Sequence, residues 1–133
     1  MREILFRGKR KDDGSWVEGV VLRIPRYTAI CVYTDYHGRH DFIEVVLETV
    51  GQYTGLTDKN GKKIFEGDIL STENGTFSNT GMGHILFYKG MWTSFYGQDA
   101  IGRDRYDELH TVCREREVIG NIHDNPEILE GGE

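Results

Sequence analysis

Residues 64–70 read Ile-Phe-Glu-Gly-Asp-Ile-Leu, a pattern typical of a strand with a sharp bend. Two apolar pairs flank a Gly-Asp step, which is the pattern of a short strand that bends sharply and continues as a second strand. Glycine adopts backbone angles that other residues avoid, and an aspartate carboxylate bonds nearby backbone N–H groups. We therefore expect Gly67 and Asp68 to form the bend of a strand that enters a small β-barrel.

Strand and turn patterns extend in both directions from this bend. Downstream, residues 84–88 and 91–96 are rich in β formers and flank Lys89-Gly90, which predicts a hairpin. Upstream, Asp13-Gly14 is a hairpin signal between strands expected at 3–7 and 16–22. Further strands are expected at 27–34, 42–54 and 118–122. Seventeen glycines against two prolines indicate many tight turns, so we predict a mainly β protein.

Helix is expected only in short turns. Residues 104–109 are compatible with one helical turn, although the stretch is short and heavily charged. Near the end of the chain, Asn125 is placed as an N-cap, with Pro126 at the first helical position and Glu127 near the positive end of the helix dipole. The sequence contains no heptads or internal repeats.

A polar, turn-rich segment at residues 55–63 is the clearest boundary in the chain of 133 residues. It divides the sequence into halves of about 65 residues, a size at which an isolated core is marginal without disulfides or metal. We predict a small N-terminal β subdomain at 1–54. We predict that it packs on an SH3-like barrel at 55–133, with a short C-terminal turn, and that the two form one cooperative unit.

Charge is unevenly distributed along the chain. The net charge is −6, but residues 1–27 carry seven Lys/Arg and four Asp/Glu, so the remainder carries −9. An acidic body disfavours phosphate backbones, which are bound by clustered cations. Two cysteines make no disulfide framework, the N-terminus has no export signal, and no window approaches the roughly 18 apolar residues of a membrane span. We expect a cytoplasmic protein with no membrane partner.

Three blocks of the sequence resemble the YopX family of phage and prophage proteins. They are Arg2-Glu3-Ile4-Leu5-Phe6-Arg7-Gly8-Lys9 followed by Trp16-Val17, then Gly51-Gln52-Tyr53-Thr54-Gly55-Leu56 through Asp58-Lys59-Asn60-Gly61 to Glu66-Gly67-Asp68-Ile69, and Val118-Ile119-Gly120-Asn121-Ile122 with Asn125-Pro126-Glu127. The resemblance implies a small β N-terminal part, an SH3-like C-terminal barrel and a phage or prophage origin. The family has no established reaction, so the resemblance supplies no catalytic residues.

Most residues of these blocks have a structural explanation. Glycines would occupy positive-φ or crowded backbone positions, two polar residues would hold turns, and two aromatic residues would fill the seam between the halves. These residues are, in that order, Gly55, Gly61, Gly67 and Gly120, then Asp68 and Asn121, then Tyr53 and Phe65.

Basic and aromatic residues cluster at the first hairpin. On one β face, such residues would stack on bases and contact phosphates, as in single-strand binders. The candidate contacts are Arg7, Lys9, Arg10, Lys11 and Trp16, with Arg23, Arg26 and Tyr27 following. Asp12 and Asp13 partly cancel the charge of the hairpin, which favours an ordinary solvated turn.

Two pairs of potential zinc ligands share an i, i+3 spacing. His37 and His40, next to Asp41, form the first pair, and His110 and Cys113 form the second. If the pairs met they would make a tetrahedral zinc site, but nothing in the sequence brings them together. We expect no metal, no cofactor and no catalytic residue.

These observations lead to three functional hypotheses. The first is a non-catalytic phage or prophage accessory protein that binds a partner protein, with homo-oligomerisation as a further expectation. The alternative is an auxiliary nucleic-acid-binding protein that uses the basic N-terminal hairpin. The third, which the sequence supports least, is a metal-dependent enzyme.

Overall fold

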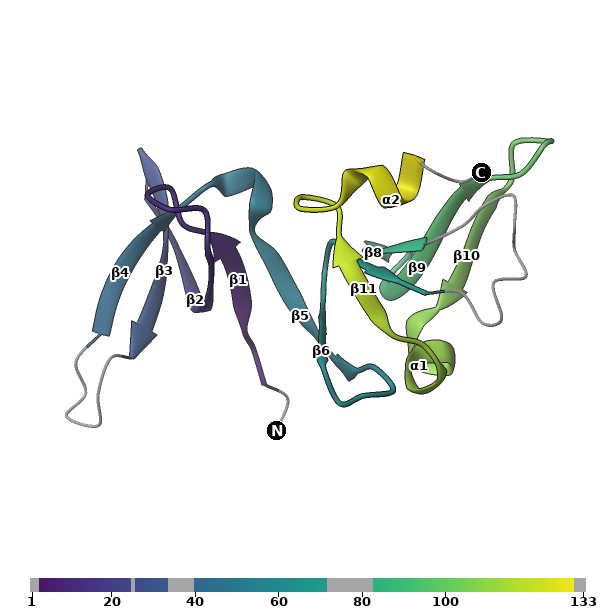
Figure 1. Ribbon diagram of the computed structural model, residues 1–133, viewed down its shortest axis with the longest axis horizontal. Helices are drawn as coiled ribbons and strands as arrows, with labels where there is room; N and C mark the ends of the chain where they lie inside the picture. The colour runs from purple at the N-terminus through teal and green to yellow at the C-terminus, as the bar shows by residue number, and fades with distance from the viewer. Residues whose placement is uncertain (1–2, 25, 34–39, 72–82, 131–133) are drawn as a thin grey trace. The chain divides into compact units, whose positions relative to one another are not determined.

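The computed structural model of the chain, shown in Figure 1, describes residues 3–24, 26–33, 40–71 and 83–130. Within these residues strands predominate and helix is confined to short segments, which confirms the prediction of a mainly β protein. The helical segments are η1 (Leu47–Thr49), α1 (Leu109–Val112), η3 (Cys113–Glu115) and α2 (Pro126–Glu130). In the described part of the chain, no helix has the length and apolar character needed to cross a membrane.

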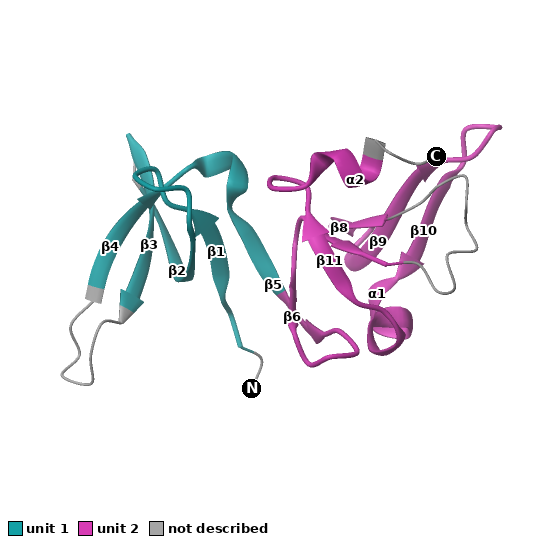
Figure 2. Ribbon diagram, viewed as in Figure 1, with its two compact units in different colours: residues 1–53 teal, residues 54–133 magenta. Residues whose placement is uncertain are grey.

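The chain divides into two compact units, coloured separately in Figure 2. Unit 1 comprises residues 1–53 and unit 2 comprises residues 54–133. Strand β5 (Gly51–Thr57) contains the division, so unit 1 ends and unit 2 begins within a single strand. Each unit is described separately below.

Unit 1 is built from antiparallel neighbours. Its strands are β1 (Phe6–Lys9), β2 (Trp16–Ile24), β3 (Tyr27–Tyr33) and β4 (His40–Val45), followed by the start of β5. Strands β4, β3, β2, β1 and β5 lie side by side in that order. The hairpin expected at Asp13-Gly14 is present, with Lys9 opposite Trp16. Strand β1 begins at Phe6, later than predicted, because Phe6 is the first residue with a partner on β2.

The residues after β1 also contact the edge strand β4. Arg10 forms an isolated bridge with Val45, supported by hydrogen bonds from Lys11 N–H to the Glu44 carbonyl at 3.1 Å and from Val46 N–H to the Lys9 carbonyl at 2.9 Å. The hairpin loop is therefore fixed against the far edge of the same group of strands.

The buried centre of unit 1 is small. Among the described residues of unit 1, the buried apolar side chains are those of Ala29, Ile30, Val45 and Tyr53. The strands approach so closely that a Cβ on Gly19 would lie 2.2 Å from the Cys31 carbonyl oxygen. Glycine is required at this position because any side chain there would force β2 and β3 apart.

Unit 2 contains a five-stranded antiparallel sheet in the order β10-β9-β8-β7-β11. Its strands are β7 (Asp68–Leu70), β8 (Gly83–Tyr88), β9 (Met91–Gln98), β10 (Asp104–Glu108) and β11 (Val118–Asn121), and β6 (Lys63–Phe65) pairs with β5. The hairpin at Lys89-Gly90 is confirmed, with φ of 52° and 82° at the two turn residues. The sheet has β10 and β11 at its edges.

The Gly67-Asp68 bend joins β6 to β7 as predicted. Gly67 has φ of 91°, and the Asp68 carboxylate accepts a hydrogen bond from the Phe65 N–H at 2.8 Å. Beneath this bend lies the core of unit 2. Its buried members are Ile64, Leu70, Ile85, Leu109, Cys113 and Val118, against which Leu56 and Trp92 pack.

The helical turn proposed for residues 104–109 is wrong. Residues 104–108 form β10, and the helix starts only at Leu109. Pairing with β9 places the Tyr106 ring 5.2 Å from the Tyr88 ring in an edge-to-face contact, so distant partners decide the conformation of this charged stretch. The final helix is confirmed from Pro126, but the Asn125 side chain accepts from the Asn121 N–H at 3.2 Å and so bonds back to β11.

Candidate functional site

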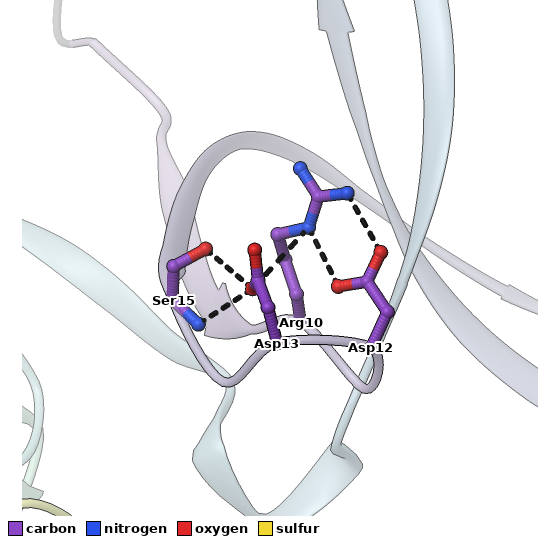
Figure 3. Close-up of polar contacts among 4 residues, drawn as sticks. All are labelled: Arg10, Asp12, Asp13 and Ser15. Atoms are coloured by element: carbon purple, nitrogen blue, oxygen red, sulfur yellow. Dashed lines mark hydrogen bonds and ion pairs between the residues drawn. The ribbon is translucent and has the colours of Figure 1, made fainter.

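Arg10 at the first hairpin is held by the two aspartates of the same loop (Figure 3). Its Nε and Nη2 donate to the two carboxylate oxygens of Asp12 at 2.9 and 2.8 Å, and Asp13 Oδ1 lies 3.6 Å from Nε. The hydrogen bond from Arg10 lowers the pKa of the Asp12 carboxyl to about 2. Asp13 Oδ1 also accepts from the N–H and hydroxyl of Ser15 at 2.9 and 2.7 Å.

The other cations of this hairpin also have intramolecular contacts. Lys11 Nζ donates to the Glu44 carboxylate on β4 at 3.1 Å. The Arg7 guanidinium carbon lies 4.5 Å from the centre of the Trp16 ring, and Lys9 Nζ lies 5.7 Å from it. Arg7 is also buried. Of the five residues predicted as nucleic-acid contacts, Arg7, Lys9 and Trp16 therefore lie together. Arg10 and Lys11 instead pair with carboxylates.

A different part of unit 1 presents apolar side chains to solvent. Val20, Cys31 and Phe42 lie directly opposite one another on β2, β3 and β4, and Leu22 follows Val20 on the same face. Because side chains alternate along a strand, all four point to one side of the sheet. Val20 is 59% exposed, Phe42 57% and Leu22 40%. We call these four residues the outer face.

A shallow groove of about 500 Å³ runs over the outer face. Leu5 and Glu18 also line it. Glu18 is exposed, and no ion pair of its carboxylate is found within the described residues. The groove therefore combines an apolar floor with one carboxylate available to an outside cation.

Sequence reasoning missed this surface. The signal was the uninterrupted apolar run at Val20, Val21 and Leu22, where a strand buried on only one face would alternate apolar with polar residues. The run indicates that both faces of β2 are apolar. Only one of these faces is packed against other residues of the described chain, and the other is exposed to solvent.

Unit 2 contains a polar network between β9, β10 and the residues before β11. Arg116, which is buried, lies 2.9 Å from the Asp107 carboxylate and also bonds to the Tyr96 hydroxyl. The Tyr96 hydroxyl donates to Asp107 Oδ2 at 2.5 Å. Burial raises the pKa of Tyr96, and the hydrogen bond to Asp107 raises it further. The three groups satisfy one another, which makes the network a brace between strands.

The residues predicted to be structural occupy constrained positions. Gly55, Gly61 and Gly67 have φ between 81° and 91°, a region that disfavours side chains. A Cβ on Gly120 would lie 2.6 Å from Asn125 Oδ1.

The remaining members of this set are Asn121 and the aromatic residues Tyr53 and Phe65, since Asp68 lies at the bend described above. The Asn121 side-chain oxygen accepts from the N–H groups of His123 and Asp124 at 3.0 and 2.9 Å, which holds the turn after β11. Tyr53 and Phe65 are both buried.

The proposed zinc ligands are not assembled in the described part of the chain. His37 and the side chain of His40 lie outside it. His110 is exposed, 3.5 Å from Glu108, whereas Cys113 is buried in the core of unit 2. The i, i+3 spacing therefore does not place these two side chains at a common site, because one faces solvent and the other faces the core. Within the described residues, no group of three or more His, Cys, Asp or Glu side chains is arranged to hold a metal ion.

Comparison with known proteins relates nearly the whole chain to one family. The structure is similar to the crystal structure of protein EF1440 from Enterococcus faecalis, with a TM-score of 0.50 and 23% identity over 97% of this chain and 99% of that one. At this identity, the likeness concerns the fold alone. No curated protein matches the sequence. The family described as YopX protein matches residues 5–130, and the chain therefore belongs to the YopX family.

Proposed function

We propose that the protein is a non-catalytic phage or prophage accessory protein that binds a partner protein through the outer face of unit 1. The observation that carries this proposal is the row of exposed apolar side chains on three adjacent strands: Val20, Cys31 and Phe42, with Leu22 beside them. Scattered exposed apolar residues need no explanation, but contiguous ones mark interaction sites.

The size of the outer face selects the kind of partner. Only three of its four side chains are well exposed, so the outer face is a small patch by the standards of monomeric proteins. A stable homodimer buries about 800 Å² on each partner. The outer face alone is therefore too small for a stable contact between two copies, and it suits a short segment of another protein.

Charge gives the partner segment its second property. Glu18 borders the groove with its carboxylate available, and the protein carries a net charge of −6. A segment with two or three apolar side chains and an adjacent Lys or Arg would cover the apolar floor and pair with Glu18. The cation would contribute mainly to association rate and specificity.

The proposal also includes the finer fold assignment of unit 2, taken by itself. Its five short antiparallel strands, with the last strand beside the first, support an SH3-like barrel. The alternative function, nucleic-acid binding through the first hairpin, has less support. Arg10 and Lys11 already pair with carboxylates, and Arg7 and Lys9 lie over Trp16.

Peptide display on the immobilised full-length chain tests the proposal. Phe42→Ser removes the ring at the β4 end of the outer face. Phe87→Ser is the matched control because Phe87 is 56% exposed on β8 of unit 2. We expect enriched peptides that combine apolar residues with Lys or Arg, and that bind the Phe87→Ser variant but not the Phe42→Ser variant. Circular dichroism checks that both variants fold. Enriched peptides that bind both variants as well as they bind the wild type would contradict the proposal.

A further inference from the structure

A second hollow of unit 1 lies at the turn between β2 and β3 and shares no residue with the outer face. Its volume is about 270 Å³. It is lined on one side by Arg23, Arg26, Tyr27 and Thr28, and also by Lys11, by Glu48 of η1 and by apolar residues between them. Arg23 lies opposite Thr28 in the β2–β3 ladder, which fixes the position of the first arginine at this mouth.

The two arginines differ from the cations of the first hairpin. Both are exposed, and within the described residues neither guanidinium has an ion pair or a hydrogen bond to a side chain. Arg10 and Lys11, by contrast, are held by carboxylates. Glu48 brings one negative charge to the hollow, which the two arginines outnumber. The hollow therefore has a surplus of positive charge that nothing in the described chain neutralises.

The acidic net charge of the protein does not oppose an anion here. Unit 1 contains eight Lys/Arg and eight Asp/Glu, so its formal net charge is zero. Unit 2 contains eight Lys/Arg and fourteen Asp/Glu, so the whole charge of −6 resides in unit 2. The excess of acidic residues, which disfavours phosphate binding, therefore belongs to unit 2 and not to unit 1.

The groups at the mouth of the hollow match a nucleotide. Guanidinium groups form paired hydrogen bonds with phosphate oxygens, which a single ammonium cannot do. Tyr27 is 41% exposed and lies next to the arginines in the turn, where its ring offers a flat surface to a base. Base–aromatic stacking tolerates any base, so the ring would contribute to affinity without selecting one base over another.

We propose that this hollow binds a nucleotide, with Arg23 and Arg26 holding its phosphate and Tyr27 stacking on its base. The nucleotide is either free or part of a single strand, and the chemistry is the same in both cases. This proposal adds to the proposed binding of a partner protein and is tested independently of it, because the two surfaces use different residues.

Fluorescence anisotropy with the full-length chain tests the site. The probe is a labelled oligothymidylate of about 12 nucleotides, within the site size usual for small barrels, titrated at low salt. The Arg23→Gln/Arg26→Gln variant should bind at least tenfold more weakly. Its salt dependence should also be shallower, by about 0.7 in the log–log slope for each phosphate that the variant no longer neutralises. The control is Arg105→Gln/Arg114→Gln, which removes the same charge from unit 2 and should bind like the wild type.

Tyrosine variants separate a nucleotide from a simple anion. Tyr27→Ala should weaken oligonucleotide binding at least ~5-fold, the lower range for removal of one stacked base, whereas Tyr27→Phe should retain it. Adenosine monophosphate is added as a second probe that competes with the labelled oligonucleotide. Displacement of the oligonucleotide identifies a free nucleotide as the ligand, and a lack of displacement identifies a strand. Circular dichroism and thermal melting confirm that each variant is folded.

Three results would overturn the proposal. The first is absence of binding to both probes at low salt. The second is equal weakening of binding in the two arginine double variants, which would indicate a general effect of charge. The third is wild-type affinity in Tyr27→Ala together with weak binding in Arg23→Gln/Arg26→Gln, which would indicate an anion site without a base.

Discussion

The two units of the molecule distribute their apolar residues in opposite ways. Unit 2 buries a contiguous cluster around Ile64, Leu70 and Leu109. Unit 1 buries few large apolar side chains and exposes many. Those exposed in the described part of unit 1 are Ile4, Val20, Leu22, Tyr27, Phe42 and Leu47, against Phe87, Ile101 and Ile119 in unit 2. The difference indicates that, among the described residues, unit 2 contains the larger apolar core, whereas unit 1 presents the exposed apolar side chains on which our proposed binding surface rests.

The largest effect is expected from truncation of Phe65, which tests whether this difference separates two folding units. Phe65 is buried in unit 2, so Phe65→Ala should cost about 3–5 kcal/mol. If the chain is one cooperative unit, as its size predicts, the whole protein should melt in one transition at a lower temperature. Lys62→Ala, in the neighbouring turn, should leave the transition unchanged.

Calorimetry and chemical denaturation measure this effect. Two transitions, of which only one moves in the Phe65→Ala variant, would show that the units unfold separately. The two units would then differ in their stability as well as in the placement of their apolar residues.

A smaller effect is expected from Gly19→Ala, which probes unit 1. The added methyl group would overlap the Cys31 carbonyl, and because the obstacle is backbone, β2 and β3 must separate. We expect a destabilisation of about 1–3 kcal/mol, the usual cost of overpacking. Gly14→Ala is the control: it has open space around it and loses only the ease of a positive φ. Urea denaturation measures the free energy of unfolding of the two variants. An equal small loss in both would mean that β2 and β3 are packed less closely at Gly19 than described.

The third effect concerns Asp58 and is specific to unit 2. Burial raises the pKa of Asp58, but backbone N–H groups of Val118, Lys62 and Asn60 donate to its carboxylate at 2.8–2.9 Å and outweigh the burial. The pKa of the folded state therefore lies below the ordinary value. A lowered pKa contributes stability above the unfolded pKa of about 4, and this contribution disappears as the pH falls through the folded pKa.

Asp58→Ala should therefore cost about 1–3 kcal/mol at neutral pH, because buried donors lose their partner. The difference from wild type should shrink as the pH falls below about 4. Asp12→Ala should show no measurable change in stability, because its pair with Arg10 is exposed. Denaturant titrations from pH 7 to pH 3 test both variants. A deficit in Asp58→Ala that is independent of pH would assign its effect to packing alone.

Local turn chemistry made part of the fold predictable. At three bends the two turn residues themselves determine the backbone conformation, and all three bends are present. They are Asp13-Gly14, Gly67-Asp68 and Lys89-Gly90. Residues 104–108 were not predictable in this way. Their strand conformation depends on the ladder with β9, and nothing within the stretch itself encodes that ladder.

The candidate sites depend on longer-range contacts still. The sequence shows Lys11 in a basic run, but its pairing with Glu44 requires β4 to return beside the first hairpin. That return neutralises one basic group and leaves Arg23 and Arg26 as the open cations of the hollow. The outer face likewise depends on strand register, which places Val20 opposite Cys31 and Cys31 opposite Phe42. The sequence alone does not give this register.

The pairing of β11 with β7 has a consequence for synthesis. The sheet of unit 2 is completed late: Val118 pairs with Leu70 and also donates its N–H to Asp58. At ribosomal rates of about 5–20 residues per second, β11 emerges roughly 2–10 s after β7. During that interval Leu70 and Ile85 lack the strand that encloses them, so the nascent chain carries an exposed core that a chaperone or a protease can reach. A chain that ends before residue 118 would lack both the partner of Leu70 on β11 and the N–H group that Val118 donates to Asp58.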